Sequence, residues 1–202
     1  QKKWHERKTP LIARRMVRFA KTQKISEFAA TLFQTKSGMD FPDLVWNAQE
    51  TGGIFATNAL MAQFEYNIYK ETPKGGWPEV KKIMIAVADR DITATERGVA
   101  EGMIIGEEVN ATRALANTPG SDMTPVALAD AARAVAGKNG VTAKILDKKA
   151  IARLGMGGVL GVAKGSGEEP KFIILEYRHG PKTQKPLVLV GKGVTFDSGG
   201  IN

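Results

Sequence analysis

Near the end of the chain, an uninterrupted apolar run leads directly into a loop dense with glycine. The run is Leu187–Val190, and the loop over residues 191–200 reads Gly-Lys-Gly-Val-Thr-Phe-Asp-Ser-Gly-Gly. Four consecutive aliphatic residues are typical of a strand buried on both faces, as in a sheet covered by helices. Glycine at this density lets the backbone take up positive φ and approach a ligand closely. We therefore expect an α/β sheet with a site at the carboxyl end of this strand, where open α/β sheets hold their ligands.

The loop carries one cation and one anion, Lys192 and Asp197. An ion pair that fixes the turn would account for both residues. A site for a metal or a phosphate would also account for them, because aspartate is a normal ligand of hard divalent cations. A lysine ligates a metal only as the neutral amine, so burial beside a dication would first have to remove its proton. The residues alone leave both interpretations open.

Helical and extended patterns alternate along the rest of the chain. Apolar residues at helical spacing predict helices over residues 11–23, 53–69, 93–115, 126–136 and 148–154. Short apolar or alternating runs predict strands over residues 25–33, 82–88, 142–146, 172–177 and 187–190. Strands that alternate with helices indicate an α/β layer architecture.

Two of these helices have an expected buried face. In the first, the apolar face comprises Ile12, Met16, Phe19 and Ala20. In the second, the apolar stripe comprises Phe55, Leu60, Phe64 and Ile68.

A break rich in turn-forming residues separates the long third helix from the fourth. Residues 117–125 read Asn-Thr-Pro-Gly-Ser-Asp-Met-Thr-Pro, a pattern typical of a helix end, a loop and a new helix start. Thr124 before Pro125 predicts an N-cap followed by proline at the first helical position. We therefore predict two domains, residues 1–116 and residues 117–202, with the long helix as the connection.

Composition excludes several classes of protein. The chain has 43% hydrophobic and 25% charged residues, as ordinary globular proteins have. No apolar stretch approaches the roughly 20 residues that span a bilayer. Without cysteine, disulfides and thiolate metal sites are excluded. The lack of cysteine suits a cytoplasmic location, which we expect. The start has neither an initiator methionine nor an apolar signal core, so we expect the numbering to begin inside a longer protein.

The net charge of +8 is concentrated at the N-terminal end. Residues 1–24 hold nine Lys and Arg against one Glu, and the remaining charges cancel. A solvated helix face or an oligomer contact would explain this basic arm, and an arm of this kind can also attract phosphates. The glycine-rich segment over residues 155–167 fits neither common phosphate-binding fingerprint. His5 and His179 are expected to be surface histidines, because neither has a second histidine at metal-ligand spacing.

Four segments together resemble the leucine aminopeptidase (cytosol aminopeptidase) family of metallopeptidases. The most specific is Val190–Ile201, which resembles the start of that family's metal-binding core. Three further segments resemble the family in the same order, namely Asn110–Pro125, the stretch from Gly155 to Ser166, and Leu175–Tyr177. The resemblance covers about residues 95–202, while residues 1–92 match only loosely.

The resemblance implies an exopeptidase that removes N-terminal amino acids, of leucine type, from peptides with two divalent metal ions. The ions would be Zn or Mn, with Mg or Co as further candidates, and the hydrolytic mechanism would use both. By position, Lys192 would be the amine ligand of one metal and Asp197 the carboxylate bridging both. Gly193, Gly199 and Gly200 would shape the loop. The fold implied is an N-terminal α/β domain joined by a long helix to an incomplete α/β catalytic domain with a mixed sheet.

The family's remaining site residues are expected beyond Asn202. They are a second lysine, three further carboxylate ligands and an arginine, so no catalytic residue is expected within this chain. The 202-residue chain should then be inactive, hold its metals poorly and have an unpaired sheet edge. The resemblance also implies a homo-hexamer for the complete protein. The alternative function is DNA binding through the basic arm, which salt would weaken steeply.

Overall fold

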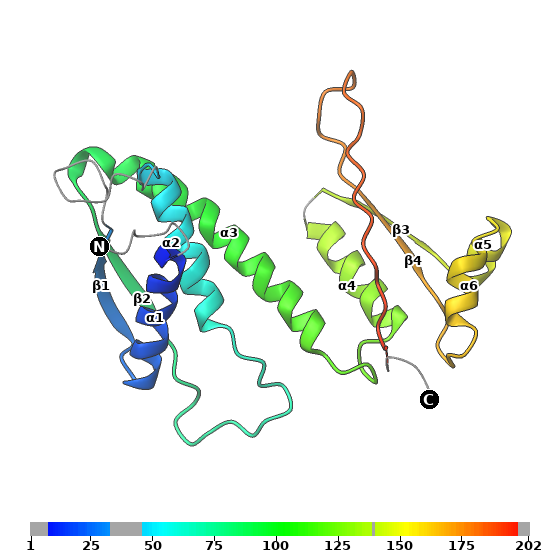
Figure 1. Ribbon diagram of the computed structural model, residues 1–202, viewed down its shortest axis with the longest axis horizontal. Coiled ribbons are helices and arrows are strands. Elements are labelled where there is room, and N and C mark those ends of the chain that lie inside the picture. The colour runs from blue at the N-terminus through cyan, green and yellow to red at the C-terminus, as the bar shows by residue number, and fades with distance from the viewer. Residues whose placement is uncertain (1–7, 33–45, 139, 198–202) are drawn as a thin grey trace. The chain divides into compact units, whose positions relative to one another are not determined.

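The computed structural model describes residues 8–32, 46–138 and 140–197. The chain separates into two compact units, Gln1–Ala116 and Asn117–Asn202. Each unit combines helices with a small two-stranded sheet (Figure 1), so the α/β class expected from the sequence is confirmed.

In the first unit, the described residues form three helices, two strands and a short 3-10 turn. The helices are α1 (Lys8–Thr22), α2 (Ala48–Gln63) and α3 (Ile92–Asn117), the last of which ends at the boundary between the units. The strands are β1 (Glu27–Thr31) and β2 (Lys82–Ala86), and the 3-10 turn η1 (Asp89–Asp91) precedes α3.

β1 and β2 form a parallel pair, with Glu27 opposite Lys82 at one end and Thr31 opposite Ala86 at the other. Parallel strands need a crossover connection, and α2 provides it. The opposite charges of Glu27 and Lys82 in register favour this pairing. The first unit is therefore a β-α-β arrangement with α1 packed against its crossover helix.

The buried face of α1 differs from the predicted one. Ala13 and Val17 are fully buried and Ala20 is 3% exposed, whereas Ile12 is 40% and Phe19 64% exposed. The prediction for Ile12 and Phe19 was wrong because the packing against α2 selects the small side chains, which allow the two helices to approach closely. Ala13, Val17 and Ala20 belong to the core of the unit together with Phe55 of α2.

The predicted helix covered residues 53–69. α2 begins five residues earlier than that prediction and also ends six residues earlier. It begins early because Asn47 and Glu50 form a capping box, in which each side chain accepts a hydrogen bond from the other's backbone N–H. It ends at Gln63, whose side-chain amide bonds both backbone groups of Val80, at 2.5 and 3.2 Å. Ile68 therefore lies beyond the helix and is 73% exposed.

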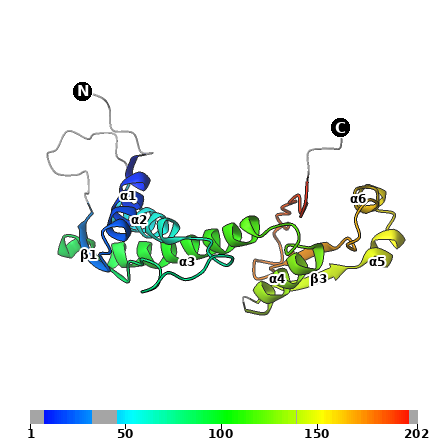
Figure 2. The same cartoon turned by 90° about the horizontal axis from the view of Figure 1, so that it is seen from below.

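α2 and α3 lie side by side (Figure 2). Glycines form the closest contacts between them. A Cβ on Gly98 would overlap the carbonyl oxygen of Gln49, and one on Gly102 would overlap that of Gly53. The Thr57 hydroxyl donates to the Gly102 carbonyl at 3.0 Å across the same contact. The two backbones can lie this close only because glycine has no side chain at these positions.

The second unit contains α4 (Pro125–Lys138), β3 (Thr142–Leu146), α5 (Lys148–Arg153), α6 (Gly157–Ala163) and β4 (Phe172–Glu176). The predicted cap of α4 is confirmed, since Ala127 N–H donates to the Thr124 hydroxyl at 3.2 Å. β3 and β4 pair antiparallel and α4 packs against both. The most buried residues of this unit include Ala129 and Ile151, which are 1% and 0% exposed.

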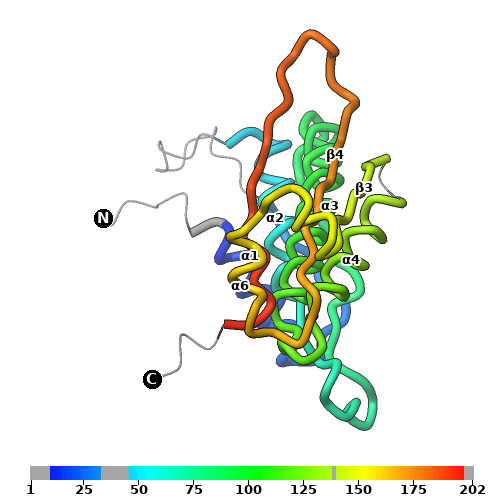
Figure 3. The backbone as a smooth tube through the Cα atoms, turned by 90° about the vertical axis from the view of Figure 1, so that its right-hand side faces the viewer, coloured from blue at the N-terminus to red at the C-terminus, as the bar shows by residue number. Residues whose placement is uncertain are grey.

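The predicted strand over residues 187–190 is absent from this structure. Figure 3 shows the chain running out in a loop after β4 and returning as an extended segment. Leu187, Val188, Leu189 and Val190 are 87%, 73%, 87% and 95% exposed. The prediction of a buried strand was wrong here because a strand needs a hydrogen-bonded neighbour, and the described sheet in this unit consists of β3 and β4 alone.

Candidate metal-binding segment

Lys192 and Asp197 lie on the extended segment that follows Val190, and both are exposed. Gly193 between them lies over α4, where a Cβ would meet the Leu128 side chain at 3.7 Å. The loop is thus reached from an exposed extended segment instead of the carboxyl end of a buried strand. Gly199 and Gly200 lie outside the described residues.

The end of this segment contacts the loop that opens the second unit. A Cβ on Gly120 would lie 2.9 Å from Cδ2 of Phe196 and 3.2 Å from the carbonyl oxygen of Thr195. Phe196 is itself 75% exposed, so only part of its ring packs on the Gly120 backbone. Two of the four family-like segments, around Gly120 and around Asp197, therefore lie against each other.

A second family-like segment has a structural role at the end of α3. Asn110 Nδ2 donates to the Leu60 carbonyl at 2.9 Å, and Arg113 Nη1 donates to the Met61 carbonyl at 2.8 Å. These carbonyls belong to the last turn of α2, whose own last turn has no basic residue. Asn110 and Arg113 therefore satisfy helix-end carbonyls that would otherwise need water.

The remaining two segments also form local structure. Gly155 adopts a positive φ of 67° just after Leu154, the C-cap of α5, and the Met156 N–H donates to the Ile151 carbonyl at 3.2 Å. This geometry is a glycine C-cap that ends α5 before α6 begins. At the end of β4, Glu176 pairs with Arg178 at 2.8 Å, and this bond lowers the pKa of the Glu176 carboxyl below its ordinary range.

His179 follows β4 and contacts the residues on either side of the β3–β4 strand pair. Its Nε2 lies 3.2 Å from the Gly140 carbonyl oxygen, and its ring centroid lies 4.5 Å from that of Tyr177. His179 thus ties the end of β4 to the start of β3, as expected for a structural surface histidine. His5 lies outside the described residues.

Within residues 8–32, 46–138 and 140–197, no group of three or more His, Asp or Glu side chains could hold a metal ion. Lys192 and Asp197 are thus two potential donors without a completed ligand set in the described part of the chain. An amine and a carboxylate suit Zn or Mn, but even one tetrahedral ion needs four donors. The described residues alone do not fit a two-metal centre.

Within the basic arm, the described residues begin with α1. Arg14 Nε donates to Asn58 Oδ1 at 2.7 Å, and Lys21 pairs with Glu65. Two of the cations are therefore engaged in contacts within the unit. Arg15 and Arg18 remain exposed on the helix.

Comparison with known proteins identifies the family. Residues 110–202 match the cytosol aminopeptidase family, catalytic domain. The chain is 39% identical to a probable cytosol aminopeptidase of Alkalilimnicola ehrlichii over 176 residues, which are 86% of this chain and 34% of that protein. It is 43% identical to one of Chlorobaculum tepidum over 161 residues, which are 76% of this chain and 32% of that protein. The chain belongs to the cytosol aminopeptidase family.

Solved structures give the same relationship. A variant of tomato leucine aminopeptidase matches with a TM-score of 0.80 at 25% identity, over 96% of this chain and 38% of that one. The bottromycin maturation enzyme BotP, solved in complex with Mn, shares the fold with a TM-score of 0.66 at 24% identity, over 84% of this chain and 32% of that one.

The chain is shorter than its relatives in the family. It spans about a third of the length of the curated relatives that it matches. None of the described helices is long and apolar enough to cross a membrane. The comparisons offer no support for DNA binding.

Proposed function

We propose that the protein to which this chain belongs is an aminopeptidase that removes N-terminal residues, of leucine type, from peptides. The match of residues 110–202 to the catalytic domain of the family carries this proposal. The relatives named as cytosol aminopeptidases support the reaction class and a cytoplasmic location. Because the chain spans only about a third of those relatives, the activity is proposed for the whole protein.

The proposed cofactors are two divalent metal ions, Zn or Mn, with Mg or Co as further candidates. Lys192 would ligate one ion through its Nζ, and Asp197 would bridge both through its carboxylate. When bound, such ions act as Lewis acids on the peptide carbonyl. The further donors and the catalytic groups would come from outside the described residues, so this chain alone should cleave no peptide.

The contact between Phe196 and Gly120 supports a positioning role for the opening loop of the second unit. Asp197 directly follows Phe196, so packing of that ring on the Gly120 backbone limits where the carboxylate can lie. Gly193, Gly199 and Gly200 would let the loop bend around the metal ions. We further propose the homo-hexamer of the family for the complete protein, to be tested by light scattering after size-exclusion chromatography.

The test combines an intact mass with an assay on a leucyl chromogenic substrate, with and without added Mn²⁺ or Zn²⁺. Material of 21.8 kDa should show no metal-stimulated cleavage. A protein that joins this chain to the rest of the family's catalytic domain should cleave the substrate and lose activity with a chelator.

A substitution pair tests the assigned ligand in that longer protein. Asp197→Asn should lower kcat by at least about a thousandfold, since it removes a bridging charge. Asp130→Asn is the matched control, because Asp130 is exposed on α4 and pairs with Arg133 one turn along. Equal activity of the two variants would refute Asp197 as a ligand. Cleavage by the 21.8 kDa chain itself would refute the assignment of the further ligands to positions beyond Asn202.

A further inference from the structure

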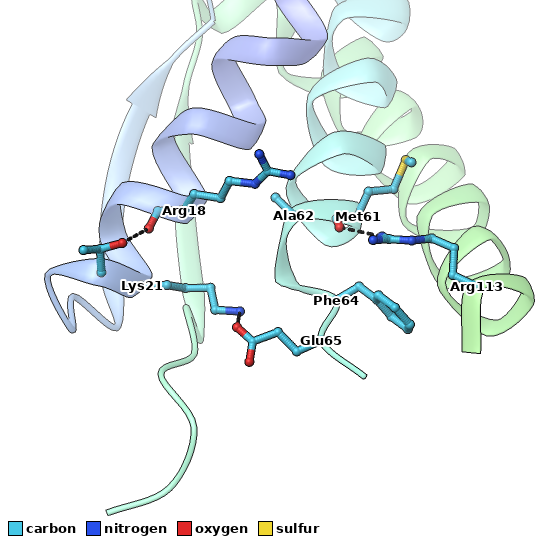
Figure 4. A pocket seen from close by; sticks show the side chains of 8 residues that line it. Arg18, Lys21, Met61, Ala62, Phe64, Glu65 and Arg113 are labelled. Atoms are coloured by element: carbon cyan, nitrogen blue, oxygen red, sulfur yellow. Dashed lines mark hydrogen bonds and ion pairs between the residues drawn. The ribbon is translucent and has the colours of Figure 1, made fainter. Parts of the chain in front are cut away.

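A polar hollow of about 360 Å³ lies in the first unit, where α1, the end of α2 and α3 meet (Figure 4). Its charged lining consists of Arg18 and Lys21 from α1, Arg113 from α3 and Glu65 just after α2. Three cations face one carboxylate, so the lining carries an excess of two positive charges. Residues distant in the sequence create this charge, which no stretch of the chain reveals by itself.

Two of the cations are fixed in place. Lys21 Nζ donates to the Gln63 carbonyl at 3.1 Å and pairs with Glu65. Arg113 Nη1 donates to the Met61 carbonyl, and its guanidinium carbon lies 4.2 Å from the centroid of the Phe64 ring. Figure 4 shows both side chains directed toward the end of α2. Their charges are therefore held in position before any ligand arrives, which lowers the entropic cost of binding.

A structural role explains the positions of Lys21 and Arg113, but not that of Arg18. Lys21 and Arg113 reach carbonyl oxygens at the end of α2, where positive charge offsets the helix dipole. Arg18 has no such role. Among the described residues its guanidinium makes no hydrogen bond or ion pair, although it lines the same hollow.

We propose that this hollow binds a small oxyanion, a carboxylate or a phosphate, through the guanidinium of Arg18. An arginine fork matches two oxygens of such a group, and charge-assisted bonds of this kind are strong. Lys21 and Arg113 supply the fixed positive field around it. Glu65 stays paired with Lys21, so its charge is compensated within the lining. The volume lies near the lower end for small-molecule sites.

The site lies wholly within the first unit and requires neither metal nor peptide cleavage. Its failure would leave the proposed aminopeptidase function untouched, and failure of that function would leave this site untouched. The probes are inorganic phosphate and acetate, titrated into the 202-residue chain at constant ionic strength. Amide and arginine Nε–H signals in ¹H–¹⁵N NMR spectra report binding at each position.

Phosphate, acetate or both should produce saturable shifts centred on Arg18, Lys21 and Arg113. Saturation by phosphate alone identifies a phosphate site, and saturation by both identifies a general oxyanion site. Arg18→Gln should weaken binding about tenfold or more, as expected for loss of a charge-assisted contact. Glu65→Gln should strengthen binding several-fold, because it removes the only negative charge among the lining side chains.

Arg15→Gln is the matched control. Arg15 is exposed on the same helix and does not line the hollow, yet its loss changes the net charge by the same amount. It should change the affinity less than about twofold, as expected for a screened surface charge. The proposal is overturned if neither anion gives saturable shifts, or if Arg15→Gln weakens binding as much as Arg18→Gln.

Discussion

At the scale of single residues, the pair of Lys21 and Glu65 links α1 to the segment after α2. The hydrogen bond from Lys21 is the largest cause that lowers the pKa of Glu65 below its ordinary value of 4.5, followed by the bond from Asn67. A carboxyl whose pKa is lowered by folding stabilises the folded state when ionised. That stabilisation is present above pH 4.5 and is lost as the pH falls through the lowered folded pKa.

Lys21→Gln should raise the pKa of Glu65 toward 4.5, as measured by ¹³C NMR titration of its side-chain carboxyl. The loss of stability in this variant should be greatest at neutral pH and should shrink as acid protonates Glu65. Because the Glu65 side chain is 38% exposed, solvent screens the pair and its contribution is at most about 1 kcal/mol.

Lys70→Gln provides the comparison, since the charge of Lys70 is the last among the causes that lower this pKa. Its effect on the pKa of Glu65 should be smaller than that of Lys21→Gln. A Glu65 titration unchanged by Lys21→Gln would contradict the pairing.

At the scale of elements, the close contact of α2 and α3 determines how the first unit packs. Gly98 faces the Gln49 backbone, and a backbone carbonyl cannot rotate away as a side chain can. A Cβ on Gly106, two turns further along α3, would lie 2.9 Å from Leu60 Cβ and 3.1 Å from the Thr57 carbonyl oxygen. The same added methyl group would therefore lie 1.8 Å from the Gln49 carbonyl oxygen at Gly98, but no closer than 2.9 Å to any neighbour at Gly106.

Gly98→Ala should destabilise the first unit by about 3 kcal/mol or more, because the helices must separate to admit the methyl group. Gly106→Ala should cost clearly less, since its methyl group would meet Leu60 Cβ at 2.9 Å, a much smaller overlap than at Gly98, and alanine favours the helix by about 1 kcal/mol. Urea unfolding followed by circular dichroism measures both changes. A Gly98→Ala protein as stable as the parent would show that α2 and α3 do not touch there.

At the scale of the whole molecule, apolar residues divide sharply between buried and exposed positions. Ile151 is fully buried in the second unit, whereas Leu189 is 87% exposed on the returning segment. The aliphatic run over residues 187–190 therefore contributes little to the stability of this chain, although it is among its most apolar stretches.

Ile151→Ala should destabilise the second unit by about 2–4 kcal/mol, through lost burial and the cavity left behind. Leu189→Ala should change stability by no more than about 0.5 kcal/mol, as is usual for exposed positions. Urea denaturation of the two variants distinguishes these outcomes. Equal destabilisation would mean that residues 187–190 are buried in a sheet, as the sequence had suggested.

The sequence predicted where the candidate metal-binding segment lies along the chain, but not its tertiary contacts. The glycine-rich loop with Lys192 and Asp197 stands out by composition and spacing, and the family match includes it. The contact of Phe196 with Gly120 could not be read from the sequence, because 76 residues separate the two positions and no periodicity connects them. The positive hollow was missed for the same reason, since its cations come from α1 and α3.

The sequence by itself determined the order and type of most elements, although it did not predict α6 and it predicted a strand over residues 187–190 that the structure lacks. Helical periodicity and the cap formed by Thr124 before Pro125 act between neighbouring residues, so local chemistry suffices. Only the tertiary structure decided that Ala13 and Val17, and not Phe19, face the core, and that residues 187–190 stay outside a sheet. Burial and strand pairing depend on which surface lies opposite, and that surface comes from distant parts of the chain.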